Sequence, residues 1–158
     1  MFRFRSRFAT LGLANFLAQY HHYLIAFVLS AYLVSFVGEA NVGYAVAGGS
    51  VIAALALLAV PAIFSQYGTK NVLTVLALAQ IATLLGLSLA DNTVAAIILY
   101  SLQGVLAFTI FIGIDLLVES QTMRENQTGN ARGIMLTITN LAVIAGTLSL
   151  SYLATQFD

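Results

Sequence analysis

Five long apolar stretches constrain this chain more than any other feature of its sequence. Each is near the ~20 residues that an α-helix needs to cross the ~30 Å hydrocarbon core of a bilayer. Charged side chains make up only 8% of the chain, against roughly 25% in a soluble domain. The sequence therefore predicts an all-α polytopic transmembrane helix bundle of about five spans. The predicted spans are residues 11–37, 42–64, 72–90, 94–118 and 133–153.

Helices are favoured over strands for these stretches. A spanning strand needs only ~10 residues of alternating polarity, and these runs are about twice as long without alternating. In lipid, a helix satisfies all of its backbone hydrogen bonds within one segment.

The basic residues predict the orientation of the spans. With five crossings, all six Lys and Arg residues fall on one side of the membrane. Glu39, Asp91 and Asp158 fall on the other side, which has no Lys or Arg. Basic residues concentrate in cytoplasmic loops. We therefore expect a multi-pass protein of the cell (cytoplasmic or inner) membrane with a cytoplasmic N-terminus. The basic set comprises Arg3, Arg5, Arg7, Lys70, Arg124 and Arg132.

Polar side chains interrupt the apolar stretches at helical spacing. Asn15, Gln19 and His22 follow one another at steps of three or four residues, so they share one face of the first span. Asn140 lies on a similar stripe in the fifth span, and Gln103 adds an amide in the fourth. Polar groups are costly in hydrocarbon, so these side chains should face a protein interior or a wet cavity.

Two interpretations of the polar stripes stay open. In one, they line a solute pathway, where His22 contacts substrate or exchanges protons near neutral pH. In the other, they join helices through hydrogen bonds worth ~0.6 kcal/mol each.

A cluster of charges is predicted at the cytoplasmic ends of the fourth and fifth spans. Asp115 lies about one turn inside Glu119, and Arg132 at the start of the fifth span or Lys70 in the 2–3 turn would supply a cation for it. The functional hypothesis is that Lys70, Asp115 and Arg132 form a gating charge network. The alternative is ordinary interfacial charge of little energetic consequence.

Several function classes lack support in the sequence. The formal net charge is zero, so there is no basic footprint for nucleic acid. There is no cysteine, and neither a nucleophile–base motif nor an H-E-x-x-H metal motif appears. We therefore expect no enzyme activity, no cofactor and no metal site.

The chain resembles the N-terminal half of a major facilitator superfamily transporter. That family joins its second and third spans by a loop of pattern G-x-x-x-D-R-x-G-R-R. Gly68 and Lys70 match the pattern, whereas Pro61, Ser65 and Gln66 replace its first Gly, its Asp and its Arg. A second likeness is an acidic residue late in the fourth span, followed by Arg132-Gly133 opening the fifth.

The resemblance implies secondary transport of a small solute, driven by an ion gradient, with the lipid bilayer as surroundings. It also implies that the chain is an incomplete N-terminal domain, residues 1–158, lacking a sixth span and a C-terminal half. The pathway contributors would be Asn15, Gln19, His22, Gln103 and Asn140. The alternative is a non-transporting assembly or scaffold subunit that packs partners on the small residues Ala45, Gly49 and Ala53.

Overall fold

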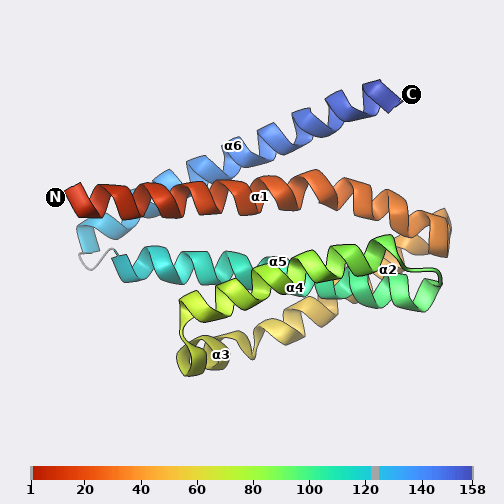
Figure 1. Ribbon diagram of the computed structural model, residues 1–158, viewed down its shortest axis with the longest axis horizontal. Coiled ribbons are helices and arrows are strands. Elements are labelled where there is room, and N and C mark those ends of the chain that lie inside the picture. The colour runs from red at the N-terminus through yellow and green to blue at the C-terminus, as the bar shows by residue number, and fades with distance from the viewer. Residues whose placement is uncertain (1, 122–124, 158) are drawn as a thin grey trace. The chain divides into compact units, whose positions relative to one another are not determined.

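The chain is entirely helical, apart from short connections, in the part that the computed structural model describes, residues 2–121 and 125–157. Five of its helices contain stretches long and apolar enough to cross a membrane: Phe8–Val37, Glu39–Leu57, Thr69–Ser88, Thr93–Ser120 and Gly129–Leu153. The prediction of an all-α membrane protein with about five spans is thus confirmed. The helices, labelled in Figure 1, are α1 (Phe2–Val37), α2 (Glu39–Leu57), α3 (Val60–Tyr67), α4 (Thr69–Ser88), α5 (Thr93–Gln121) and α6 (Glu125–Phe157).

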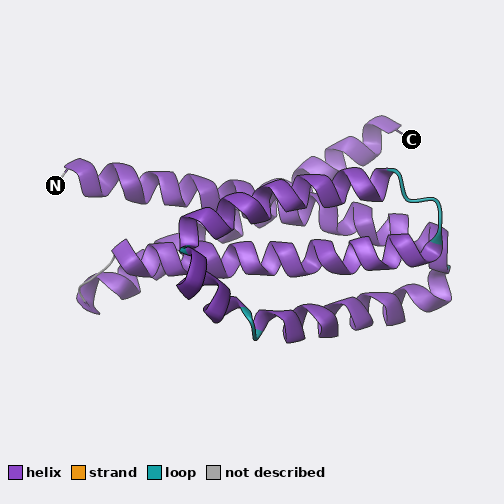
Figure 2. Ribbon diagram, turned by 60° about the horizontal axis from the view of Figure 1, so that its bottom comes forward, coloured by secondary structure: helices purple, strands orange, loops and turns teal. Residues whose placement is uncertain are grey.

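The structure corrects the second span, because residues 42–64 are not one helix. α2 ends at Leu57, and the N–H groups of Leu58 and Ala59 close tighter i→i−3 turns of 3.2 and 3.1 Å. Pro61 explains the break, since it has no N–H for the Leu57 carbonyl and its ring would clash with that carbonyl in a continuous helix. Figure 2 shows the resulting loop and the change of direction into the short helix α3.

Two compact units make up the fold, and α1 and α5 each contribute to both. The terminal unit consists of Met1–Ala26 and Ile114–Asp158, and the central unit consists of Phe27–Gly113.

In the terminal unit, α1 and α6 run in the same direction and cross in close contact (Figure 1). A Cβ built on Gly12 would lie 3.0 Å from the Ile138 side chain. Further along both helices, a Cβ on Gly146 would lie 3.3 Å from the backbone atoms Leu24 N and Tyr20 O. Glycine at these two positions therefore lets the helices approach closely.

In the central unit, α5 packs antiparallel to α4 and runs in the same direction as α2 (Figure 1). Leu73 near the start of α4 meets Gly113, and Leu99 meets Gly86 near the end of α4. On the other side, Gly49 of α2 meets Ser101. These directions are those expected for consecutive helices that cross a membrane alternately.

Charges segregate to opposite ends of the central unit. Lys70 lies in the first turn of α4, next to the Gly113 region of α5, whereas Glu39 begins α2 and Asp91 follows α4 at the other end. The connections at Gly38 and Gly68 both have φ of +77°, a backbone conformation that favours glycine. Which side of the membrane each end faces stays a prediction.

Candidate functional site

The carboxamide of Gln103 is the most unusual polar group that the structure describes. Gln103 is only 4% exposed, and neither its Nε2 nor its Oε1 has a hydrogen-bond partner. It lies ten residues into α5, which corresponds to ~15 Å along the helix axis. The amide is therefore near the middle of a candidate span, at a depth where the hydrocarbon of a bilayer offers no hydrogen-bond partner.

The other buried polar side chains of the central unit form hydrogen bonds within their own helices. Ser101 and Thr109 of α5 donate their hydroxyl protons to the carbonyls four residues earlier, at 2.8 and 2.7 Å. Thr83 of α4 does the same to Ala79 O at 2.8 Å. Such hydroxyl bonds within one helix remove the cost of burial without needing a ligand. The Gln103 side chain makes no such hydrogen bond within α5.

Chemically, the Gln103 side chain offers two N–H donors and a carbonyl acceptor. Burying an amide without compensating hydrogen bonds costs roughly 1–3 kcal/mol by protein mutational data. A group that both donates and accepts, such as a hydroxyl, an amide or water, would satisfy it. If an uncharged solute carried such a hydroxyl or amide, it would satisfy the Gln103 amide without bringing a charge into the buried site.

Asn15 has a different role, because its amide already joins two helices. Its Nδ2 donates to Met135 O at 3.3 Å and to Thr139 Oγ1 at 3.0 Å, both on α6. Further along α1, the hydroxyl of Tyr20 donates to Ser149 Oγ at 3.0 Å. These contacts favour the helix-joining interpretation for Asn15.

The other residues predicted for the pathway in the terminal unit differ in exposure. Gln19 is 9% exposed, one turn beyond Asn15. His22 is half-buried, and its ring meets the Tyr23 ring edge-on at 5.3 Å between centroids. Asn140 is exposed. Roles for these three in a pathway stay predictions.

Sequence reasoning missed Thr139, the α6 side chain that contacts Asn15. The buried face of α6 contains Ala131, Met135, Ala142 and Gly146, and Thr139 lies between them at the same spacing. The Ala142-x-x-x-Gly146 pair was a usable signal, because small residues four apart mark the face on which helices pack closely.

Among the charged residues, Arg132 pairs with Glu119 in the described part of the chain. Arg132 Nη2 lies 3.7 Å from Glu119 Oε1, and the two side chains are 66% and 60% exposed. Asp115 lies one turn before Glu119 and is exposed, as is Lys70 in the central unit. A gating network of Lys70, Asp115 and Arg132 stays a prediction.

Known proteins provide no family assignment for the chain. No family model, curated protein or solved structure matches it. Within the described residues, no three His, Cys, Asp or Glu side chains come together as metal ligands would.

Proposed function

We propose that this chain forms one wall of a transport pathway for a small, uncharged polar solute, with Gln103 as a residue that contacts the solute. The buried, unpartnered amide of Gln103 is the observation that supports this function. A fold that leaves such a group unpaired accepts a free-energy cost, and a bound solute or water would recover it.

The absence of charge along the neighbouring helices supports an uncharged solute. Between Thr93 and Phe111, α5 has no Asp, Glu, Lys or Arg, and α2 and α4 have only Glu39 and Lys70, at their starts. A charged solute at mid-membrane would need a partner of opposite charge. A solute with only hydroxyl or amide groups needs no opposite charge, because hydrogen bonds with an amide side chain are sufficient to bind those groups.

The proposed transporter class is the major facilitator superfamily. Gly68 and Lys70 match the loop pattern of that family, and Arg132-Gly133 opens the fifth span after an acidic residue late in the fourth. In that class the pathway lies between two halves that rock against each other. This chain would supply most of one half, and a second half would complete the pocket. An ion gradient is the proposed energy source, and Asn15 holds α1 against α6 while the pathway opens and closes.

A cysteine accessibility experiment tests the pathway directly, because the chain has no native cysteine. In Gln103→Cys, a membrane-impermeant methanethiosulfonate cation should modify the new thiol whenever the pathway opens to water. Leu106→Cys and Leu102→Cys are matched controls on α5, since Leu106 is buried at 6% exposure and Leu102 is 41% exposed. Neither control should react appreciably, because neither should contact water.

The Gln103→Cys variant also identifies the solute. A compound that the pathway binds should slow modification of the thiol at position 103 and should be taken up by vesicles that contain the full-length protein. If that thiol reacts no faster than the one in Leu106→Cys, Gln103 does not line an aqueous pathway. In that case the amide would instead contact a helix of another chain, as a scaffold subunit would require.

A further inference from the structure

The short helix α3 lies where the chain leaves one span and enters the next. α2 has 19 residues and α4 has 20, so at 1.5 Å per residue each is ~30 Å long and crosses the hydrocarbon core by itself. Neither crossing therefore needs the eight residues of α3. Figure 2 shows α3 turned away from the direction of α2.

One side of α3 is fixed to the central unit. Val60 and Phe64 are 3% and 5% exposed, and with Val72 of α4 they form a core cluster against which Leu73 and Ile112 pack. Phe64 and Leu73 also lie against Gly113, where an added Cβ would come within 2.8 and 2.7 Å of them. α3 is thus fixed at the level of the first turn of α4.

The remaining surface of α3 is divided between apolar and polar residues. Ile63 and Tyr67, one turn apart, are 41% and 59% exposed. Ser65 and Gln66 are exposed as well. Such a helix, apolar on one side and polar on another, is suited to the boundary between acyl chains and headgroups.

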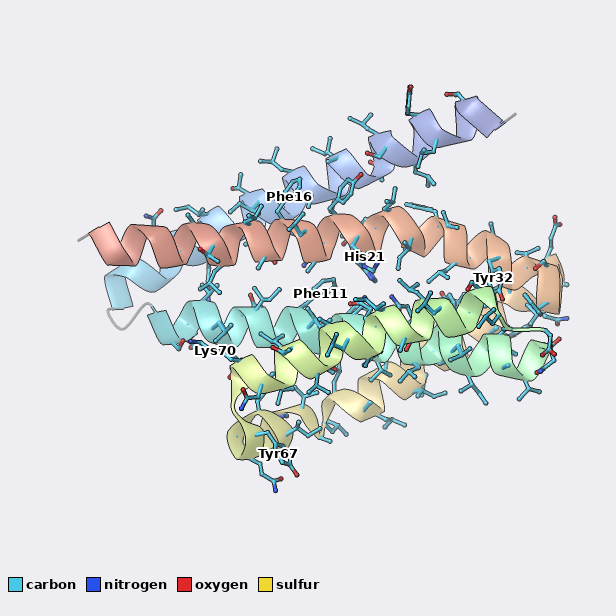
Figure 3. The ribbon with its side chains drawn as sticks, viewed as in Figure 1. Phe16, His21, Tyr32, Tyr67, Lys70 and Phe111 are labelled. Carbon is cyan, nitrogen blue, oxygen red and sulfur yellow. The ribbon has the colours of Figure 1, made fainter. Side chains whose placement is uncertain are left out.

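Tyr67 ends α3 and Lys70 lies in the first turn of α4, on either side of the connecting residue Gly68 (Figure 3). Tyrosine is enriched at membrane–water boundaries, where its ring is in the apolar layer and its hydroxyl is in the polar one. Lys70 is exposed, and it is the only charged residue between Glu39 and Asp91. Its positive charge complements the phosphates of anionic lipids.

We propose that α3 is an interfacial helix that lies in the headgroup layer of the bilayer, with Tyr67 as its anchor and Lys70 as a binding group for anionic lipid. The partner of this surface is lipid. The segment does not lengthen the second span, and its lipid contact is independent of the solute pathway.

A single tryptophan measures the depth of α3, because the chain has none of its own. Tyr67→Trp and Ile63→Trp each report on α3, and Leu78→Trp is the deep reference, since Leu78 is 63% exposed and lies midway along α4. Each full-length variant is placed in vesicles whose lipids are brominated either near the headgroup or near the chain end. The two α3 reporters should be quenched more by the shallow label, and the α4 reference more by the deep one.

The role of Lys70 is measured in the same vesicles. With brominated anionic lipid mixed into zwitterionic lipid, the indole of Tyr67→Trp should prefer the anionic species about fivefold, the effect of one basic residue near the surface. Adding Lys70→Gln to that variant should reduce the preference to about one.

Three outcomes would each overturn the proposal. They are deeper quenching of both α3 reporters than of the α4 reference, no quenching of the α3 reporters by lipid, and an unchanged lipid preference when Lys70→Gln is added. Absence of lipid quenching would mean that another protein covers α3.

Discussion

Replacing Gly146 by valine should force α1 and α6 apart. The Cβ alone would lie 3.3 Å from Leu24 N and Tyr20 O, and these are backbone atoms that cannot move without the whole of α1. Valine adds two further methyl groups on a stiff side chain. Overpacking costs about 1–3 kcal/mol, and separation would also weaken the nearby Tyr20–Ser149 bond, worth ~0.6 kcal/mol. We expect a total loss of about 1.5–3.5 kcal/mol.

Gly133→Val is the matched control, because Gly133 is on the same helix and an added Cβ there meets no atom within 4 Å. Both variants would be unfolded from detergent micelles by titration with dodecyl sulfate, with near-ultraviolet circular dichroism of the tyrosines as the signal. The free energy of unfolding should fall in Gly146→Val relative to Gly133→Val. Equal values within about 0.5 kcal/mol would refute close α1–α6 contact, since the overpacking cost is larger than that.

Two further predictions use the same titration. Asn15→Ala should lower the free energy of unfolding by about 1–2 kcal/mol, because it removes both amide bonds to α6, whereas Thr139→Val removes one of them and should cost about half as much; equal stability of Asn15→Ala and the natural chain would contradict the helix-joining role. Arg132→Gln should change stability by no more than about 0.5 kcal/mol, because its pair with Glu119 is solvent-exposed, and a loss above about 1.5 kcal/mol would instead indicate a network that includes Asp115.

The spans were predictable because hydropathy is a property of whole segments. A run of about twenty apolar residues has few alternatives to a membrane helix, so single misjudged positions hardly matter. The break after Leu57 depends on one residue instead. Pro61 was visible in the sequence, but membrane helices often tolerate proline. Here the packing of Val60 and Phe64 against α4 holds α3 as a separate helix.

The candidate site was harder to predict because it depends on which side chains of different helices contact one another. The spacing of Asn15 and Gln19 was sufficient to place both on one face of α1, and both are buried. On α6, however, a shift of one residue rotates a side chain by ~100°, which is the difference between exposed Asn140 and Thr139, the partner of Asn15. The amide of Gln103 was apparent in the sequence, but its lack of a partner is a property of the fold.

Gln103→Leu should stabilise the chain while abolishing the proposed transport. An unsatisfied buried amide costs about 1–3 kcal/mol, and leucine, an apolar side chain of similar size, removes that cost. The dodecyl sulfate titration should therefore give a higher free energy of unfolding for the variant. A solute that protects the thiol of Gln103→Cys should stabilise the natural chain but leave Gln103→Leu unchanged. If Gln103→Leu instead loses more than about 1 kcal/mol, the amide has a partner in the folded chain. It would then not be available to a solute, because the cost attributed to its burial would already be offset.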